Sequence, residues 1–520
     1  MNAGRHRKQY WGCWGLLLGL SGCATEGFRD VQLPPPPKLN PLVAPAVSAL
    51  GREIFVDLQL KDDRCGNYDP ATRRCGGGTY SAFRDLNQAA GTAQSGDQVQ
   101  VREGVIRKQF VATVSGSEGR SVTFSPYRDE RVVFSDIDAP AWRLDGANYL
   151  VLEGFRVERV LGWARLENAQ HNEIRNNSFH EALARGTTGG LKLVNSHYNR
   201  IEGNFFEHGN DSLVLQASDR NLVADNRFKW GRHSLLSLRC GNFNVIRGNQ
   251  FRNERQKAME VYDCQAVSDA PYRLDATKRN LIEGNQFNHT RGSSQSHNYN
   301  AIQYAGQLGI VRNNLFRDNR GGGINLAVYA DEALYNYGQR IYNNTFYANR
   351  CFALIDMARG GSRVGEHDFV NNLFYKNRDC KGGERQVGLA WKDLDEGSNA
   401  LLERDPGFVD EAAGDLRLRA ESPWVDRGVF LTHTLAEGKG RRLPVADVAF
   451  FFDGAGVPGV SGDEIQLEGE RSTARVLAVD FATGALLLDR DLRWRRGQGV
   501  SLHYQGESPD MGAYETPLSE

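Results

Sequence analysis

One pattern of apolar and polar residues recurs along the chain: a short apolar stretch, a polar or glycine residue, Asn or Gly, one further residue, and Phe. It occurs as LVLEGFRV, NEIRNNSF, NRIEGNFF, NLVADNRF, NVIRGNQF, NLIEGNQF, GIVRNNLF, QRIYNNTF and HDFVNNLF. The repeated positions are Phe155, Phe179, Phe206, Phe228, Phe251, Phe287, Phe316, Phe346 and Phe374, spaced 22 to 36 residues apart. A repeat of this length is typical of a solenoid, in which each unit packs on its neighbours.

The residues within each unit indicate the kind of solenoid. Each unit contains short β-branched runs broken by Asn and Gly, and none has a long helical face. Short strands joined by tight turns predict a parallel β-helix with one coil per unit. We expect Phe to stack on Phe inside the coils, and Asn on Asn at a turn, where Asn tolerates left-handed backbone. The repeat resembles the right-handed parallel β-helix superfamily over roughly residues 55 to 425.

The remaining segments set the domain boundaries of this all-β chain. We expect a lipoprotein signal peptide over 1–22, a Pro-rich tether over 23–50 and a right-handed parallel β-helix solenoid over 51–428. Residues 429–507 lack the repeat and contain the hairpin pattern TARVLAVDF-ATG-ALLLDRDL, so they predict a small β-rich C-terminal appendage. We expect it to cap the open end of the solenoid, with a binding role as the alternative. Residues 508–520 form a closing segment and tail.

The N-terminus predicts the compartment. Basic residues at positions 5 to 8 precede an apolar run over 11–20, and Leu20-Ser21-Gly22-Cys23 follows. This string resembles the lipobox of bacterial lipoproteins, which implies lipidation of Cys23. An ordinary secretory signal is the alternative. Ala24 after the cysteine favours the outer membrane by the same resemblance. We therefore expect a lipid-anchored protein of the bacterial cell envelope, on the periplasmic or surface face.

Six cysteines remain after Cys13 and Cys23, an even number that suggests disulfides in an exported protein. Cys240 and Cys264 lie 12 and 13 residues after their Phe, and Cys351 and Cys380 lie 5 and 6 after theirs. Residues at similar offsets lie on neighbouring coils, so both pairs can form bridges. Cys65 and Cys75 enclose a short loop and are the third expected pair. Zinc is the alternative, but no Cys-x-x-Cys string occurs.

Composition excludes a disordered, collagenous or polytopic membrane protein. With 63 Lys and Arg against 64 Asp and Glu, the net charge is −1, and we expect no nucleic-acid partner. One segment departs from this balance, because residues 220–257 hold nine basic residues and two acidic ones, a net charge of +7. The basic residues are Arg220, Arg227, Lys229, Arg232, Arg239, Arg247, Arg252, Arg255 and Lys257. A solvated charge run is the alternative to a binding surface.

The same coils carry candidate chemistry. Asp211 and His233 each lie five residues after a repeated Phe, so they are expected to be neighbours. His208 and Trp230 share offset 2, and Asn210 and Arg232 share offset 4. With Arg239, Glu260 and Lys192 from nearby strands, they would supply an acid, an imidazole, a guanidinium and an aromatic platform for a sugar face.

The string SLRCGNFNVIRGNQF, residues 237–251, resembles the LRHG-containing segment of the polysaccharide lyase family that includes chondroitinase B and alginate lyases. The resemblance implies a catalytic Arg at Arg239 and β-elimination from a uronate, whose carboxylate is neutralised by calcium or cationic groups. Cys240 replaces the motif's His. Gln216 or Ala217 stands near the place of the family's Lys, and its calcium ligands are matched loosely by Asn210 and Asp211.

The hypothesis is a monomeric lipoprotein that acts on an acidic polysaccharide by β-elimination. His233 is the candidate base, Arg239 stabilises charge, and Asp211 orients His233 or, with Asn210, holds Ca²⁺. The candidate substrate-binding residues are His208, Trp230, Arg232, Lys192, Arg255, Lys257 and Glu260. The alternatives are a noncatalytic polysaccharide-binding protein and, disfavoured because polygalacturonase-like strings are absent, a glycoside hydrolase with paired carboxylates.

Overall fold

The computed structural model describes residues 51–184, 189–253, 255–262, 278–288, 299–327, 336–357, 364–389, 394–395 and 397–517. The described residues belong to one compact unit. The predicted signal peptide and tether, including Cys23, lie outside the described residues and stay predictions. No helix of the described part is long and apolar enough to cross a membrane.

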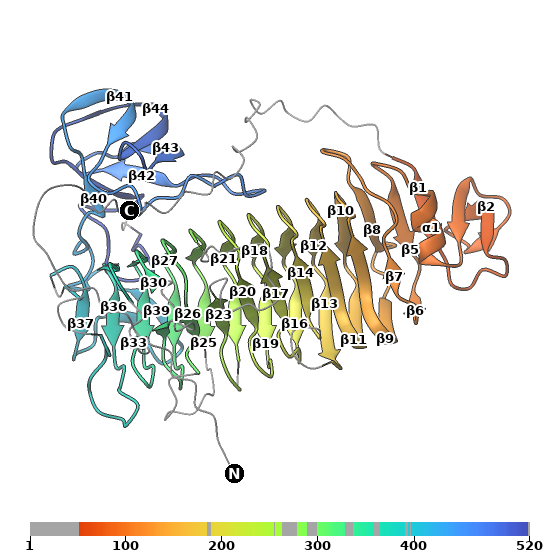
Figure 1. The fold of residues 1–520 in the computed structure, drawn as a ribbon, viewed down its shortest axis with the longest axis horizontal. Coiled ribbons are helices and arrows are strands. Elements are labelled where there is room, and N and C mark those ends of the chain that lie inside the picture. The colour runs from red at the N-terminus through yellow and green to blue at the C-terminus, as the bar shows by residue number, and fades with distance from the viewer. Residues whose placement is uncertain are drawn as a thin grey trace, which may run out of the picture. The chain divides into compact units, whose positions relative to one another are not determined.

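The chain is a right-handed parallel β-helix with a small β-rich sheet near its C-terminus, as the repeat predicts. Figure 1 shows the strands of successive coils side by side. One wall, here called sheet A, takes one strand from each coil. Its strands are β1 (Glu53–Val56), β5 (Gln98–Val101), β8 (Val122–Pro126), β10 (Leu150–Glu153), β12 (Glu173–Arg175), β15 (Arg200–Glu202), β18 (Leu222–Ala224), β21 (Val245–Arg247), β24 (Leu281–Glu283), β27 (Ile310–Arg312), β31 (Arg340–Tyr342) and β35 (Asp368–Val370).

Two further strand rows complete each coil, and β9 (Val132–Asp145) and β11 (Arg156–Glu167) are long enough to span both. Row one contains β6 (Gly104–Ile106), β13 (Ser178–Ala182), β16 (Phe205–Glu207), β19 (Arg227–Lys229), β22 (Gln250–Arg252), β25 (Gln286–Asn288), β28 (Leu315–Arg317), β32 (Thr345–Tyr347), β36 (Leu373–Tyr375) and β37 (Ala400–Leu402). Row two contains β7 (Phe110–Val111), β14 (Leu191–Val194), β17 (Leu213–Gln216), β20 (Leu236–Arg239), β23 (Met259–Tyr262), β26 (Ile302–Tyr304), β29 (Ile324–Ala327) and β33 (Leu354–Met357).

Smaller elements flank the coils. At the N-terminal side are β2 (Arg64–Asp69), β3 (Arg74–Cys75), β4 (Tyr80–Phe83) and α1 (Leu86–Thr92). The pair β30 (Asn336–Tyr337) and β34 (Val364–Gly365) is parallel, and the pair β38 (Phe408–Asp410) and β39 (Asp415–Leu418) is antiparallel. The C-terminal sheet, here called the appendage, contains β40 (Thr432–His433), β41 (Gly438–Pro444), β42 (Glu464–Leu467), β43 (Thr473–Asp480), β44 (Ala485–Trp494) and β45 (Gly499–Leu502).

The repeated Phe residues stack inside the coils as expected. From Phe179 to Phe374, successive rings lie 4.7 to 5.0 Å apart between centroids and 3 to 8° from parallel. The first expected member was wrong, because Val157 rather than Phe155 pairs with Phe179. Phe155 instead packs edge-on against Trp142, a buried ring from β9 that fills this part of the interior.

Asparagine ladders hold the turns, also as expected. In the ladder through Asn204, Asn226 and Asn249, each Oδ1 accepts bonds from the backbone N–H and the side-chain amide of the Asn one coil earlier. These Asn residues are buried, so the ladder satisfies polar groups that water cannot reach. The coil register is thereby fixed at a turn as well as in the core.

The disulfide predictions have two outcomes within the described residues. Cys65–Cys75 and Cys351–Cys380 are bonded, with Cα atoms 5.8 and 3.8 Å apart. Cys240 is disulfide-bonded, and its expected partner Cys264 lies outside the described residues.

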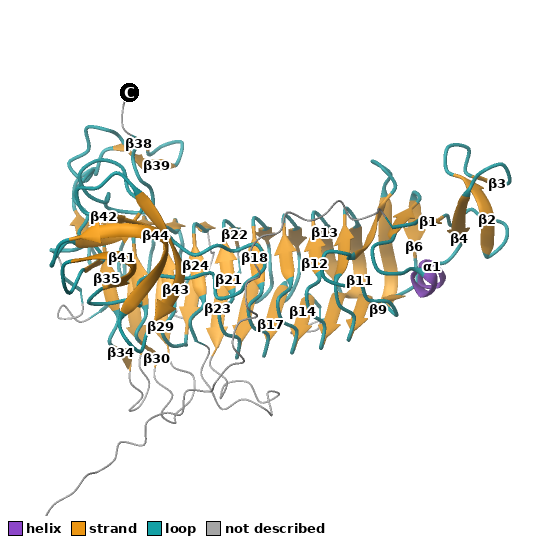
Figure 2. Ribbon diagram, turned by 90° about the horizontal axis from the view of Figure 1, so that it is seen from above, coloured by secondary structure: helices purple, strands orange, loops and turns teal. Residues whose placement is uncertain are grey.

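The appendage packs on the flank of the solenoid, against sheet A (Figure 2). Outward residues of β18, β21 and β24 share an apolar cluster with the appendage, as Leu222, Val245 and Leu281 pack near Leu443 and Phe451. The sequence predicted a cap over the open end, which was wrong, because these apolar side chains on sheet A need cover along its face. The last strand of the coils is β37, which ends at Leu402.

Candidate functional site

The predicted residues meet at the corner where row one turns into row two. The turns before β17 and β20 carry Asp211 and His233, and pairing of Phe206 with Phe228 sets these turns on adjacent coils. The His233 amide donates to the Asn210 carbonyl at 3.0 Å, which joins the two turns directly. The repeat offset thus predicted a true neighbour pair.

Asp211 is held by three donors. His233 Nδ1 lies 2.7 Å from its Oδ1, the Ser234 amide donates to the same oxygen at 3.2 Å, and Arg239 Nη2 lies 3.4 Å from Oδ2. The Asp211 side chain is 2% exposed, whereas that of His233 is 34% exposed. The buried carboxylate therefore fixes the imidazole through Nδ1, while part of the ring stays exposed.

A second carboxylate lies beneath the imidazole. Glu260, on β23, places Oε1 3.7 Å from His233 Nε2, and the same oxygen is paired with the ammonium of Lys257. Ser237, the register partner of Glu260 on β20, donates to Oε2 at 3.4 Å. Glu260 and Lys257 are buried, so they support the site from below rather than offering a surface for a sugar.

These contacts shift the pKa values of the pair in opposite directions. The hydrogen bond to Asp211 raises the pKa of His233 above 6.5, against its partial burial, and the charge of Glu260 adds to the rise. Burial alone would raise the pKa of Asp211, but the hydrogen bond and charge of His233, with the charge of Arg239, lower it below 3.8. Each partner thus stabilises the charged form of the other.

A groove of about 660 Å³ is lined by Arg232, the residue before His233, but not by His233, Asp211 or Arg239 themselves. It is lined by Glu181, Ala182, Leu183, His208, Trp230, Arg232 and Arg255. His208 and Trp230 stack with ring centroids 5.1 Å apart. Arg232 and Arg255 are exposed and form no ion pair with a described residue, so they are available to an anion. Four of the predicted substrate-binding residues therefore share one groove.

Lys192 lies apart from this group. Its register partner on β17 is Val214, which in turn pairs with Ser237, so Lys192 stands two coils before Ser237 in the same column. It does not line the groove. Its predicted contact with the polymer stays a prediction.

The residues do not fit the expected calcium site. Both oxygens of Asp211 face cationic or N–H donors, and the Arg239 guanidinium stands where a cation would be repelled. Glu260 is likewise engaged by Lys257. Within the described ranges, no three His, Cys, Asp or Glu side chains are grouped as metal ligands would be.

Sequence reasoning missed three supporting residues. Tyr262 is the register partner of Arg239, lies with its ring 5.1 Å from that guanidinium, and hydrogen-bonds to Glu260. Asn253 holds the turn below by donating to the carbonyls of His233 and Lys257. Ser237 was within reach of prediction, since register from the repeated Phe pairs it with Glu260.

Comparisons with known proteins agree with the fold. Residues 141–291 match the family described as "Periplasmic copper-binding protein (NosD)", a right-handed β-helix family. The uncharacterized protein YwoF of Bacillus subtilis (strain 168) is 23% identical over 199 residues, which are 36% of this chain and 41% of that protein. The chain therefore spans less than half the length of this curated relative.

Solved structures to which the chain is similar include three lyases. They are pectate lyase Pel9A (13% identity, TM-score 0.43, covering 90% of this chain and 98% of that one), a rhamnogalacturonan lyase (15%, 0.46, 71% and 94%) and the alginate lyase from Paenibacillus sp. str. FPU-7 (14%, 0.39, 58% and 96%). At these identities the likeness concerns the fold alone.

Proposed function

We propose that this protein is a carbohydrate-active β-helix protein of the bacterial envelope that cleaves an acidic polysaccharide by β-elimination. The observation that carries the proposal is the Asp211–His233–Arg239 group, next in the chain to a groove that holds a stacked ring pair and two arginines without an ion pair to any described residue. The predicted lipidation of Cys23 and the periplasmic description of the matching family support the location.

The chemistry follows from the positions of the charges. Arg232 and Arg255 bind uronate carboxylates along the groove, and Arg239 offsets the charge that develops on the reacting sugar. Neutral His233 takes the C5 proton at Nε2, while Asp211 holds the ring through Nδ1. The C5–H electrons form the C4–C5 double bond as the C4–O4 bond breaks, and the imidazolium can return its proton to O4.

Turnover is tested by incubating the protein with a panel of uronate polymers and following the ultraviolet absorbance of the new double bond. We expect absorbance to rise with at least one polymer, and His233→Ala to abolish the rise while leaving binding largely intact. An absorbance rise that is equal in wild type and His233→Ala would contradict the assignment of the base.

A noncatalytic polysaccharide-binding protein is the second candidate, and one observation favours it. The contacts of His233 with Asp211 and Glu260 raise its pKa and so favour the imidazolium, which suits a cationic binding group better than a base. Binding without an absorbance change across the panel, including at alkaline pH, would support this candidate.

A further inference from the structure

A column of stacked side chains runs along another corner of the solenoid, where row two turns back into sheet A. Tyr149 stacks on His171 with centroids 4.7 Å apart and planes 2° from parallel, and His171 stacks on Tyr198 at 5.0 Å and 3°. All three residues adopt left-handed backbone conformation, with φ of 55 to 58°. The repetition of one turn on successive coils thus builds a ladder of flat rings.

One end of this ladder is closed. The next rung is Arg220, whose guanidinium lies 5.9 Å from the Tyr198 ring and 4.9 Å from the Phe243 ring. Arg220 Nε also donates to the Ala455 carbonyl of the appendage at 2.9 Å, and Arg220 is buried. The appendage therefore covers the ladder at this end.

The opposite end is open. The strand register places small residues in the three preceding rungs, in the order Ser121, Gly96 and Gly51 away from Tyr149. This register follows from the pairs Leu150 with Val122, Gln98 with Thr123, and Glu53 with Gln98. Among the described residues, Tyr149 has a ring neighbour only in His171. The Tyr149 face that points away from His171 therefore borders the small Ser121 rung, and the Arg120 guanidinium lies against Gly96 in the rung beyond.

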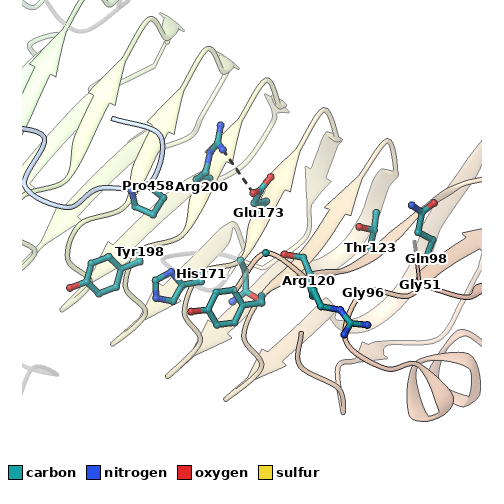
Figure 3. A pocket seen from close by; sticks show the side chains of 14 residues that line it. Gly51, Gly96, Gln98, Arg120, Thr123, His171, Glu173, Tyr198, Arg200 and Pro458 are labelled. Carbon is teal, nitrogen blue, oxygen red and sulfur yellow. Dashed lines mark ion pairs between the residues drawn. The ribbon is translucent and has the colours of Figure 1, made fainter. Parts of the chain in front are cut away.

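This vacancy is part of a pocket of about 450 Å³ (Figure 3). Its lining includes the three ladder rings, the small rungs, Arg120, Arg200 and, from the appendage, Pro458. The volume lies within the ~300–1,000 Å³ of typical ligand sites. Rungs repeat about every 4.8 Å, so a flat ligand ring can take the place of a missing rung.

The charges around the pocket differ in their availability. Glu173 lies 3.9 Å from Arg200 and 3.1 Å from Arg175, and Arg200 also pairs with Glu202. Arg120 is exposed, donates to the Ser95 carbonyl at 3.0 Å, and forms no ion pair with a described residue. Glu118, two residues earlier, raises the pKa of Tyr149 together with burial, the larger cause. Arg120 is therefore the pocket cation most available to a carboxylate.

We propose that this pocket is a second, noncatalytic binding site for an acidic oligosaccharide. One pyranose ring extends the ladder by stacking on Tyr149 above Ser121, and its carboxylate pairs with Arg120, whose guanidinium lies against Gly96. Its hydroxyls bond to the polar ring edges of the ladder. The proposal rests on the proposed function only for the class of ligand, because it shares no residue with the candidate functional site.

The test is calorimetric titration of galacturonate and mannuronate tetramers into His233→Ala protein, with cellotetraose as the neutral probe. The His233→Ala background prevents cleavage of the probe. We expect two sites per chain for at least one acidic tetramer, one lost in Arg232→Gln/Arg255→Gln and the other weakened at least tenfold by Arg120→Glu. Ser121→Trp fills the vacant rung and should weaken the same site equally. Arg404→Glu, which makes the same charge change at an exposed position elsewhere, should leave both sites intact.

Unchanged binding in Arg120→Glu or in folded Ser121→Trp would overturn the proposal, as would equal binding of cellotetraose or no acidic tetramer bound at this site. If Ser121→Trp fails to fold, judged by thermal unfolding, Arg120→Glu decides. If wild-type protein cleaves no uronate polymer but Arg120→Glu weakens tetramer binding, the second site stands and the lyase proposal is rejected. If the protein cleaves a polymer but binds only one tetramer per chain, the lyase proposal stands and the second site is rejected.

Discussion

The solenoid contains two clusters of buried charge that are alike in composition and unlike in access. In the candidate functional site, Asp211 and Glu260 are buried while His233 reaches solvent. In the second cluster, Arg312 binds both oxygens of Asp463 at 2.5 and 2.7 Å and donates to Glu283 at 2.7 Å. Arg312 is 4% exposed, and Asp463 belongs to the appendage.

The difference lies in what completes each cluster. Arg312 also donates to the Tyr342 hydroxyl, which donates to the Phe450 carbonyl, so partners from the chain itself surround the guanidinium. The appendage thus seals this cluster and is anchored by it. At the corner of Asp211, the side chain of His233 stays 34% exposed, so one side of that cluster reaches solvent. Buried charge alone is therefore poor evidence of function, whereas buried charge that holds an exposed, titratable group is better evidence.

Removing the exposed imidazole of His233 should have the largest effect on turnover. We expect His233→Ala to lower turnover of the responsive polymer by about 10²–10⁴-fold, the usual contribution of a general base. Initial rates from double-bond absorbance measure this loss. Arg312→Leu, assayed well below its unfolding temperature, is the matched variant and should keep near wild-type turnover. If Arg312→Leu loses as much activity as His233→Ala, the contrast between the clusters fails.

Removing the sealed guanidinium should act on stability instead. Arg312→Leu leaves Glu283 and Asp463 without their main partner in a buried place, and we expect a loss of about 3–5 kcal/mol in the free energy of unfolding. Urea unfolding measures it. Arg417→Leu, which breaks an exposed pair with Asp415, should cost under about 1 kcal/mol. Equal costs for the two variants would mean that the appendage is held by other contacts.

The candidate functional site should also respond to pH through His233. Because Asp211 raises the pKa of His233, kcat/KM should rise with pH through a midpoint above 6.5, as the neutral base replaces the imidazolium. The free energy of unfolding should change with pH in the opposite direction. The raised pKa of His233 contributes stability that is fully present below 6.5 and is lost as pH rises through its folded pKa.

Asp211→Asn is the variant that checks this pH dependence. It removes the main cause of the raised pKa, so the midpoint of the kcat/KM profile should move to lower pH, while the maximal rate falls because the imidazole loses its anchor. A profile measured at constant ionic strength tests this. A midpoint that stays in place would show that His233 is not the titrating group.

Much of the fold and half of the candidate site could be predicted from the sequence, for one physical reason. In a solenoid, offset from a repeated residue predicts spatial neighbours, so Phe stacking, the Asn ladder and the His233–Asp211 contact all followed from spacing. The Arg312–Asp463 pair could not be predicted, because no repeat relates residues that lie 151 positions apart. The burial of Glu260 and Lys257 was missed because the offset from a repeated Phe predicts which residues are neighbours but not how exposed to solvent they are.

The smallest expected effect is on KM and concerns the two exposed arginines of the groove. Arg232→Gln and Arg255→Gln each remove one exposed cation from the groove, and we expect KM for the responsive polymer to rise about 3–10-fold with kcat nearly unchanged. The reason is that surface charges steer and hold an anionic chain without joining the proton transfer. Steady-state kinetics at two salt concentrations measure the effect, which should shrink at high salt. Arg404→Gln, which removes an exposed cation elsewhere, should leave KM unchanged. A fall in kcat with constant KM would instead place these arginines among the groups that act on the reacting sugar.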